Sequence, residues 1–448
     1  MFHLNNFMKK VLFIAYYFPP IGGGGIQRSV NFVKYLPDLG YFPIVLTCSN
    51  PAEERWTPKD YTLEKDIKIN CKVFRVGTLP PPPDTKIMQR LKKLFFLQDN
   101  FSKWWIKYAI ELGEEIIKEN NIDVIYATMS PFQSSYVADY LSKKYKIPWV
   151  ADLRDPWALD EMVLYPSLIH RRYDLNRMKV VLSGTSAIIM NTPEAAKSLK
   201  NRFHEFKNKY ILTITNGYDA NYFDRILEKG KNIKFRIVHS GSLFSGTGMQ
   251  LNRRKLLYNI LGGVNKNVNI LGRSLVYLLK SIEEWIEEFP EIIEDIEILL
   301  IGNLTQDDIV FLEGRRCEKI FVFTGYISYE ESINYLKSAD VLFLPMHGTT
   351  GGLRATTVPG KLYEYMASGR PILAAVPEGD AKDILIKSGL AYISPPDDNK
   401  LLLEGLKSMY NGWKNGIHRY NPNWDYISKY ERKNLTKMLS EVLDSVII

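Results

Sequence analysis

Short apolar segments alternate with helical segments along almost the whole chain, and this alternation limits the folds that the chain can adopt. The apolar segments are short and bounded by turn residues, as strands are. Strands that are separated by helices do not pair as hairpins, so they form a parallel sheet with helices on both faces. The expected strands are 10–16, 43–47, 72–76, 123–127, 148–151, 187–191, 210–215, 235–239, 296–301, 320–324, 341–344 and 371–375. The predicted fold class is therefore α/β with a doubly wound parallel sheet.

The alternation is interrupted once, after Asn216 and Gly217, where the chain becomes polar before the strands resume. A chain of 448 residues is expected to hold two or three domains. We predict an N-terminal domain over 1–220, a second α/β domain over 221–415 and a closing helix within 416–448. An Asn/Gly-rich stretch at about 246–272 is interpreted as a surface insertion in the second domain. Open parallel sheets bind ligands at the carboxyl ends of their strands, so we expect the site there, in a cleft between the domains.

Composition and apolar runs exclude several classes of protein. Hydrophobic residues make up 46% and charged residues 24% of the chain, so wholesale disorder and coiled coil are excluded. The apolar run at 11–18 ends at two prolines, and a membrane-spanning helix needs about 20 apolar residues. The same prolines and the missing small-residue cleavage site argue against a signal peptide. Cys48, Cys71 and Cys317 show no metal spacing and cannot all pair, which favours a reducing cytoplasm.

A basic and aromatic segment, 86–110, carries six basic residues against one acid. Trp104, Trp105 and Lys107 lie within it. Aromatic rings and lysines together suit binding to an anionic membrane surface, and such a segment could also bind the anionic backbone of a nucleic acid. An ordinary helix would instead bury these rings in the core and expose its lysines. We expect no nucleic-acid partner, and the membrane contact and the ordinary helix stay open as alternatives.

A glycine-rich loop, Gly22-Gly23-Gly24-Gly25, separates the first strand from the first helix, and Arg28 follows it. Glycines let the backbone approach a ligand, and a helix N-terminus favours anions, so a phosphate or sugar site is one interpretation. A plain tight turn is the other. The loop is not a dinucleotide fingerprint, since the third glycine position holds no glycine. The histidines are scattered and no Asp-x-Asp occurs, so we expect no metal site.

Two polar clusters stand where a sheet of this kind places its ligands. Asp152, Arg154 and Asp155 follow a strand, as a ligand site or as a structural ion pair. Lys361 and Glu364 lie one turn apart near the start of a predicted helix. Lys361 offers positive potential for a diphosphate, and Glu364 can accept two hydrogen bonds from ribose hydroxyls. The alternative is a solvated i,i+3 ion pair.

These positions resemble the GT-B glycosyltransferases, specifically family 4, whose members use nucleotide sugars. The matching stretches occur in family order over nearly the whole chain: AYYFPPIGG from Ala15, ADLRDPW from Ala151, ITNGYD from Ile214, HSGSL from His239, FTGY from Phe323, SADVLFLP from Ser338 and GKLYEYMASGRPIL from Gly360. The resemblance implies two Rossmann-like domains with a deep cleft between them. The second domain would hold the nucleotide sugar, and the first would bind the acceptor.

The resemblance also implies roles for individual residues. Glu364 matches the glutamate that holds the nucleotide ribose, and Lys361 would stabilise the departing diphosphate. Arg28 would lie toward the acceptor. The other residues implied to contact the donor are Gly22, Gly23, Gly24, Gly25, Asn216, Gly241, Ser242, Thr357, Val358 and Pro359. Such enzymes usually need no metal or cofactor, because cations neutralise the leaving diphosphate.

The sequence departs from the family pattern in two motifs. Thr356 stands where the first glutamate of the E-x7-E motif is expected, so the contacts to the sugar hydroxyls must differ. Arg154 stands where many members have a histidine. The role of positioning the sugar is therefore open among Arg154, Asp152 and Asp155.

The arginine that binds the diphosphate is displaced by the insertion. Arg273 is the best match, and Arg253 and Arg254 are the alternatives. We therefore expect a cytoplasmic, metal-independent, retaining glycosyltransferase that uses a nucleoside diphosphate sugar and a glycan or lipid-linked acceptor. Its expected pathway is surface polysaccharide or glycolipid synthesis, with peripheral contact at the inner face of the membrane. The rival expectations are a GT-B epimerase or phosphorylase and a non-catalytic sugar-nucleotide-binding protein.

Overall fold

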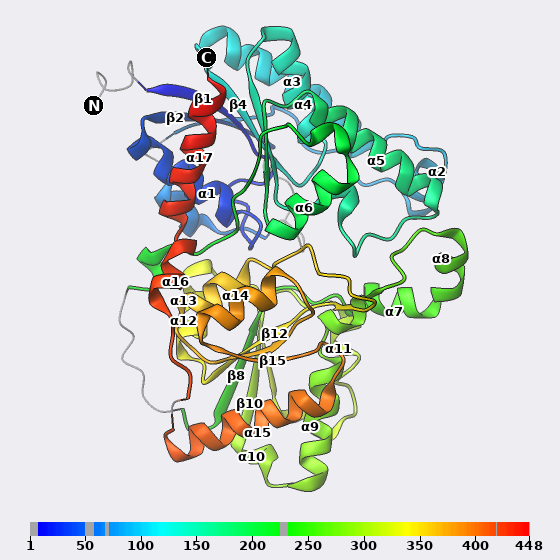
Figure 1. The fold of residues 1–448 in the computed structure, drawn as a ribbon, viewed down its shortest axis with the longest axis vertical. Helices are drawn as coiled ribbons and strands as arrows, with labels where there is room; N and C mark the ends of the chain where they lie inside the picture. The colour runs from blue at the N-terminus through cyan, green and yellow to red at the C-terminus, as the bar shows by residue number, and fades with distance from the viewer. Residues whose placement is uncertain (1–7, 50–57, 68–70, 225–231, 418, 448) are drawn as a thin grey trace. The chain divides into compact units, whose positions relative to one another are not determined.

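The computed structural model describes residues 8–49, 58–67, 71–224, 232–417 and 419–447. The chain divides into two compact units (Figure 1). Unit 1 comprises Met1–Asn216 together with Arg432–Ile448, and unit 2 comprises Gly217–Glu431. The first division lies at the polar junction that the sequence marks, and the C-terminal segment joins the N-terminal unit.

Unit 1 is built on a seven-stranded parallel sheet in the order β3-β2-β1-β4-β5-β6-β7. Its strands are β1 Lys9–Ile14, β2 Tyr41–Thr47, β3 Lys72–Arg75, β4 Val124–Met129, β5 Trp149–Leu153, β6 Ala187–Met190 and β7 Ile211–Thr213. The chain runs outward from β1 to β3 and then returns to β4 on the other side of β1. The loops after β1 and β4 therefore diverge, which is the switch point at which doubly wound sheets bind ligands.

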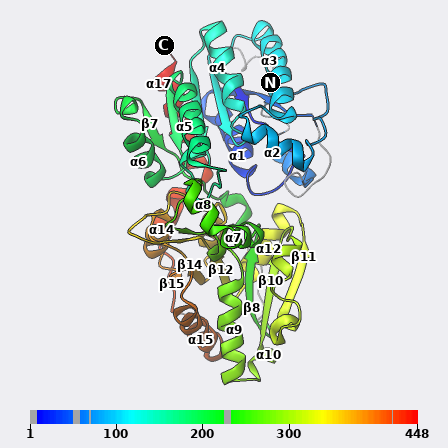
Figure 2. The same ribbon diagram turned by 90° about the vertical axis from the view of Figure 1, so that its right-hand side faces the viewer.

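The helices of unit 1 cover both faces of this sheet (Figure 2). They are α1 Gln27–Tyr35, α2 Lys86–Leu94, α3 Asn100–Glu119, α4 Ser134–Tyr145, α5 Leu168–Ser183, α6 Pro193–Arg202 and α17 Arg432–Val446. The α17 helix packs on α1, and its Leu435, Leu439 and Leu443 are buried. Its Asp444 accepts hydrogen bonds from Lys9 Nζ at 2.5 Å and Tyr41 Oη at 2.6 Å. These contacts fasten the end of the chain to the N-terminal unit.

Unit 2 has the same architecture, with a six-stranded parallel sheet in the order β11-β10-β8-β12-β14-β15. Its strands are β8 Phe235–Ser240, β10 Ile296–Ile301, β11 Phe321–Gly325, β12 Val341–Pro345, β14 Ile372–Ala375 and β15 Ala391–Ser394. The switch point lies between β8 and β12. The α/β prediction is confirmed in both units, whereas β15 lies outside the strands that the sequence analysis predicts. It is a partly buried edge strand, and such a strand lacks the continuous apolar run of a central one.

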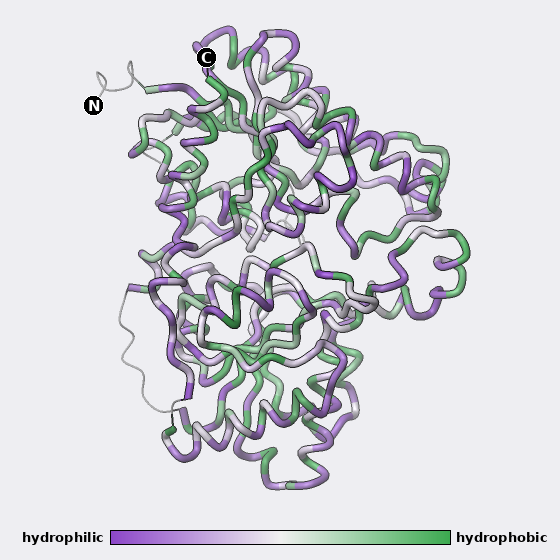
Figure 3. Tube along the Cα trace, viewed as in Figure 1, coloured by the Kyte–Doolittle hydropathy of each residue, from purple (hydrophilic) through white to green (hydrophobic). Residues whose placement is uncertain are grey.

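Two hydrophobic clusters hold the helices of unit 2 to opposite faces of its sheet. The apolar strands stand out against polar outer helices in Figure 3. The helices are α7 Ser245–Arg253, α8 Lys255–Leu261, α9 Val276–Glu288, α10 Ile292–Asp295, α11 Gln306–Ile309, α12 Tyr329–Ser338, α13 Lys361–Ala367, α14 Asp380–Ser388, α15 Asn399–Asn415 and α16 Trp424–Ile427. No helix among the described residues has the length and apolar character needed to cross a membrane.

Two predicted segments have more internal structure than expected. The stretch 246–272 contains most of α7, all of α8, the short strand β9 (Val268–Asn269) and a 3-10 turn at Ile270–Arg273. The strand β9 pairs antiparallel with β13 (Gly348–Thr349). The predicted closing helix is interrupted: α16 is followed by a 3-10 turn at Ser428–Tyr430 before α17 begins. The turn coincides with the return of the chain from unit 2 to unit 1.

Candidate functional site

In unit 2, the central strand β8 ends beside the side chain of Lys361. Gly241, the next residue after β8, has φ of +87°, and its N–H donates to the carbonyl of Ile301 at 2.7 Å. A Cβ atom at this position would lie 3.1 Å from Lys361 Nζ. Glycine is therefore needed here for two reasons: its φ is positive, and the ammonium group lies close to the backbone.

His239, the penultimate residue of β8, is buried and meets the same lysine. Its Nδ1 lies 3.0 Å from the carbonyl oxygen of Phe343, and its Nε2 lies 3.3 Å from Lys361 Nζ. Burial and the positive charge of Lys361 hold the pKa of His239 well below its ordinary value. The neutral ring assigned by this environment donates from Nδ1 to the carbonyl and accepts at Nε2 from the lysine. His239 thus orients the ammonium group.

Arg273 brings a second positive charge to this cluster. Its guanidinium carbon lies 4.3 Å from the ring centroid of Phe244. Burial and the charge of Arg273 lower the pKa of Lys361 to about 7, against an opposing effect of Glu364. Two positive charges close enough for one to lower the pKa of the other favour an anion between or beside them. Among the three candidate arginines, Arg273 is the one that perturbs Lys361, whereas Arg253 and Arg254 are exposed at the end of α7.

Helix α13 carries Glu364 one turn after Lys361. Glu364 Oε1 accepts a hydrogen bond from Tyr329 Oη at 3.0 Å, which fixes the carboxylate on the side of α12. The preceding segment is also positioned: Thr356 and Val358 are buried. The buried hydroxyl of Thr357 has no hydrogen-bond partner among the described residues.

The remaining donor residues in unit 2 lie in the same loops. Gly241 and Ser242 are partly buried after β8, and Pro359 starts the turn that leads into α13. Ser240, the last residue of β8, donates its N–H to Tyr365 Oη at 2.9 Å, which ties β8 to α13. The structure therefore gathers Gly241, Arg273, Lys361 and Glu364 around one strand end.

In unit 1, Arg28 and Asp152 form a fully buried ion pair. Arg28 donates to both carboxylate oxygens, from Nε at 2.8 Å and from Nη2 at 2.7 Å. Tyr126 Oη donates to Asp152 at 2.5 Å, and Arg28 Nη1 donates to the Thr215 carbonyl at 2.7 Å. Burial alone would lower the pKa of Arg28, but the carboxylate of Asp152 raises it. These bonds assign the pair to the interior of unit 1, where it joins α1, β4 and β5.

The burial of this pair bears on the roles that the sequence suggested for both residues. Arg28 is 2% exposed and Asp152 is 0% exposed, so neither side chain presents a charged group at the surface of unit 1. The expectation of an acceptor contact at Arg28 is replaced by a positioning role. The structural ion pair that the sequence left open is real, but Asp152 pairs with Arg28 rather than with Arg154.

Arg154 fastens the glycine-rich loop. Its guanidinium donates to the carbonyl of Gly25, to the carbonyl of Ser130 at 2.9 Å and to that of Met129 at 3.1 Å. A Cβ atom on Gly25 would lie 3.2 Å from Arg154 Nη1. Arg154 therefore ties the loops after β1, β4 and β5 together, and Asp155 stays exposed beside it.

The glycine-rich loop itself is short and held at its ends. Gly22 donates its N–H to the Pro58 carbonyl at 2.6 Å, and Gly23 has φ of +96°. Gly24 has no neighbour that a Cβ atom would contact within 4 Å, so its backbone is open to a ligand.

Asn216, at the end of unit 1, is held by an asparagine that the sequence analysis did not select. Asn191 Oδ1 accepts from the N–H of Asn216 at 2.8 Å, and Asn191 Nδ2 donates to the Arg154 carbonyl at 2.9 Å. Sequence reasoning also missed His239, Tyr329 and Tyr126 as site residues. The signal for His239 was its place at the carboxyl end of a central strand. Tyr126 lies inside a strand and Tyr329 opens a helix, so nothing local marked either of them.

The aromatic and basic segment divides into two helices with different roles. Trp105 in α3 is 0% exposed and donates from Nε1 to Ser134 Oγ at 3.2 Å. Trp104 is 7% exposed and donates to Thr78 Oγ1 at 3.0 Å. Both rings belong to the core of unit 1, in agreement with the ordinary helix that the sequence left open beside the membrane contact. Lys107 is exposed, with its ammonium 4.9 Å from the centroid of Tyr108.

Helix α2, by contrast, buries no residue. Its apolar side chains and those just after it are exposed: Ile87, Met88, Leu91, Leu94, Phe95, Phe96 and Leu97. Lys86, Arg90 and Lys93 lie among them. Helix α2 is therefore the part of the basic and aromatic segment that could contact a membrane surface, whereas α3 is a core helix.

Within the described part of the chain, no three His, Cys, Asp or Glu side chains gather in a group that could hold a metal ion. The candidate site of unit 2 instead presents Lys361 and Arg273 as its positive charges. An anionic ligand with hydroxyl groups matches this donor set, since Glu364 supplies an acceptor.

The fold is that of the GT-B glycosyltransferases, as comparison with solved structures shows. Sucrose-phosphate synthase from Thermosynechococcus elongatus superposes with a TM-score of 0.63 at 15% identity, over 98% of this chain and 99% of that one. Anabaena Alr3699/HepE in complex with UDP-glucose gives a TM-score of 0.60 at 15% identity, over 97% and 99%. An E. coli structure described as trehalose-6-phosphate bound with UDP-2-fluoro glucose gives 0.62 at 11% identity, over 97% and 99%.

The family comparison concerns unit 2. Residues 265–411 match the family model described as Glycosyl transferases group 1. This range contains Arg273, Lys361 and Glu364. No curated protein matches the sequence. The GT-B resemblance of the sequence is confirmed, whereas assignment to family 4 and retention of configuration stay predictions.

Proposed function

We propose that this protein is a glycosyltransferase that moves a sugar from a nucleoside diphosphate sugar to a glycan or lipid-linked acceptor. The observation that carries the proposal is the pair of cations at the end of β8, Lys361 and Arg273, within the range that matches the glycosyl transferases group 1 family. Two of the structural neighbours bind UDP-sugars, as their descriptions state. A UDP-sugar is therefore the first donor to test.

The proposed donor contacts follow from the chemistry of each group. Glu364 accepts hydrogen bonds from the ribose hydroxyls, with its carboxylate oriented by Tyr329. The backbone at Gly241 and the side chains of Lys361 and Arg273 receive the diphosphate. The hydroxyl of Thr357, buried and unpartnered among the described residues, offers a further polar contact.

The proposed reaction breaks the bond between the anomeric carbon and the diphosphate. Negative charge then builds up on the leaving diphosphate, and positive charge on the sugar, in an oxocarbenium-like transition state. Lys361 and Arg273 stabilise the leaving group because they are already in place and partly desolvated. The acceptor hydroxyl attacks from the same face and passes its proton to an oxygen of the leaving diphosphate, so configuration is retained and no protein nucleophile or bound metal takes part.

The acceptor is proposed to lie on a membrane surface, at its cytoplasmic face, in polysaccharide or glycolipid assembly. Helix α2 supports this, since Ile87 is 72% and Phe95 62% exposed beside basic residues. Binding to anionic vesicles is expected to fall when Leu91 and Phe95 are both changed to serine. Unchanged binding in that variant would remove α2 from the proposal.

The experiment that tests the donor is a melting-temperature screen against nucleotide sugars, beginning with UDP-glucose. Ligand binding to the native state stabilises it by about 2.7 kcal/mol at a hundredfold excess over Kd. We expect a shift with one sugar nucleotide in the wild type and in Glu313→Ala, an exposed glutamate of the same unit, and none in Glu364→Ala. No shift with any sugar nucleotide in the wild type would contradict the proposal.

Turnover then separates the proposed function from its rivals. Transfer to an acceptor, with release of the nucleoside diphosphate, supports the transferase. Conversion of the sugar nucleotide without transfer indicates an epimerase, and dependence on phosphate indicates a phosphorylase. Donor binding with no reaction indicates a binding protein, an outcome that the departures at Thr356 and Arg154 make worth testing.

A further inference from the structure

Helix α8 in unit 2 exposes an apolar face that nothing in its own unit covers. None of its seven residues is buried. Leu256 is 75%, Leu257 52%, Ile260 73% and Leu261 42% exposed. The helix projects from the body of unit 2 (Figure 1). A short helix with this many exposed apolar side chains is unusual on a protein surface unless it meets a partner.

The neighbouring helix α7 anchors this projection. A Cβ atom on Gly248 in α7 would lie 2.8 Å from the Cα atom of Leu271, so α7 packs directly on the backbone of the turn that leads to Arg273. Gln250 Nε2 donates to Tyr258 Oη at 3.3 Å, which links α7 to α8. Helix α8 is therefore attached to a helix that is itself packed on unit 2.

Along the sequence, the charged residues on either side of α8 are of one sign. Between 245 and 282 the sequence has no Asp or Glu. Its basic residues there are Arg253, Arg254, Lys255, Lys266, Arg273 and Lys280. A helix that combines exposed aliphatic side chains with flanking cations fits the interface of an anionic lipid bilayer.

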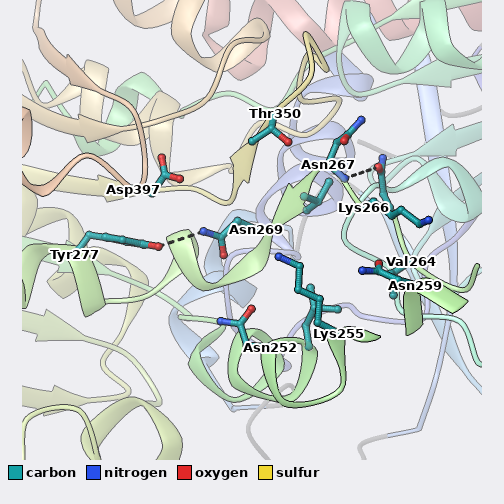
Figure 4. A pocket seen from close by; sticks show the side chains of 13 residues that line it. Asn252, Lys255, Asn259, Val264, Lys266, Asn267, Asn269, Tyr277, Thr350 and Asp397 are labelled. Atoms are coloured by element: carbon teal, nitrogen blue, oxygen red, sulfur yellow. Dashed lines mark hydrogen bonds between the residues drawn. The ribbon is translucent and has the colours of Figure 1, made fainter. Parts of the chain in front are cut away.

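The opposite side of α8 lines a polar pocket of about 260 Å³. At 3.6 residues per turn, Lys255 and Asn259 share one face, whereas Leu256 and Ile260 lie on another. Lys255 points into the pocket from α8, and Asn269 lies across from it on β9 (Figure 4). Asparagines and Lys266 make up much of the remaining wall, and Asp397 is the one acidic residue among those that line it. The other lining residues are Leu251, Val264, Val268, Tyr277 and Thr350.

Several polar side chains of this pocket have hydrogen-bond donors and acceptors that no described residue uses. The side chains of Asn252, Lys255, Asn259 and Lys266 make no hydrogen bond or ion pair with any other residue in the part of the chain that the structure describes. Amides and ammonium groups bind hydroxyls and phosphate oxygens. A pocket of this chemistry, on the polar side of a helix with an apolar outer face, suits a phosphate-bearing and hydroxyl-bearing lipid headgroup.

We propose that α8 is a membrane-docking helix that unit 2 contributes, and that the pocket behind it receives the headgroup of an anionic lipid. Leu256, Leu257, Ile260 and Leu261 enter the interfacial region, and Lys255 and Asn259 contact the headgroup. The proposal is independent of α2, which belongs to unit 1, and of transferase activity, since docking is measured without donor or turnover.

The test is co-sedimentation of the full chain with vesicles of phosphatidylglycerol and phosphatidylcholine in equal parts, or of phosphatidylcholine alone. The background carries Leu91→Ser and Phe95→Ser, which removes the contribution of α2. In this background, Leu256→Ser with Ile260→Ser is expected to weaken binding to the mixed vesicles at least about tenfold, because two apolar side chains leave the interface. The matched control is Val310→Ser with Ile386→Ser, two exposed aliphatic residues of the same unit, which are 47% and 60% exposed.

The polar arm of the test changes Lys255 to Gln and Asn259 to Ala. We expect the preference for phosphatidylglycerol over phosphatidylcholine to fall, with an unchanged melting temperature because neither residue has a partner to lose in the described structure. An unchanged preference would overturn the headgroup pocket. Equal binding of the α8 variant and its control would overturn docking. A wild-type dimer that the α8 variant dissociates, without vesicle binding, would assign the face to a second copy instead.

Discussion

The affinity for the donor should depend on pH through Lys361. Burial and Arg273 lower the pKa of this lysine to about 7 in the free protein. A bound diphosphate places negative charge beside the ammonium group and raises the pKa again. Below pH 7 the lysine is already protonated and binding is strongest. Above pH 7 binding requires uptake of a proton, so affinity falls as pH rises.

The size of the effect follows from linkage. If the complex restores the ordinary lysine value of 10.5, Kd should increase about 30-fold between about pH 6 and pH 8.5, or about 2 kcal/mol. Isothermal titration calorimetry with UDP-glucose, or with whichever sugar nucleotide the screen identifies, measures this directly. A sugar nucleotide is the right probe, because its diphosphate does not titrate in this range.

The control is Lys361→Arg, which keeps the charge at all these pH values. We expect its affinity for the sugar nucleotide to be nearly constant with pH, and that of Lys361→Met to be weak and equally constant. A flat profile in the wild type, or the same slope in Lys361→Arg, would refute the assignment of the proton to Lys361.

Three further predictions follow from the same contacts. Glu364→Gln should raise the Kd of the sugar nucleotide about tenfold to a hundredfold by calorimetry, since a hydrogen bond to a charged group is worth about 1.5–3 kcal/mol; an unchanged Kd would exclude the ribose role. Asp152→Ala should lower the free energy of unfolding in urea by about 3–5 kcal/mol, because it leaves Arg28 charged and buried. The double change Arg28→Met, Asp152→Leu should recover much of that loss, and no recovery would contradict the argument. Trp105→Ala should lower the free energy of unfolding by about 3–5 kcal/mol without changing vesicle binding. A variant of unchanged stability that binds vesicles more weakly would contradict the placement of Trp105 in the core.

The sequence determined the fold class and marked several residues of the candidate site in unit 2. The alternation of apolar strands and helices is a local pattern, and a parallel sheet is the one arrangement that satisfies it. Lys361 and Glu364 were recognisable because both lie on one helical turn, where spacing alone sets their proximity. Gly241 was selected through the resemblance of the HSGSL stretch to the family.

The tertiary structure decided which of the candidate residues meet. Arg28 and Asp152 are 124 positions apart, and their pairing depends on the order of β1, β4 and β5 in the sheet, which no local pattern encodes. The choice among Arg273, Arg253 and Arg254 depended on how the inserted helices fold back. Burial likewise separated Trp105 from the exposed residues of α2, although both lie in one basic and aromatic segment. Long-range packing determines which side of a helix faces the core, whereas spacing along the chain reports only which residues share a side.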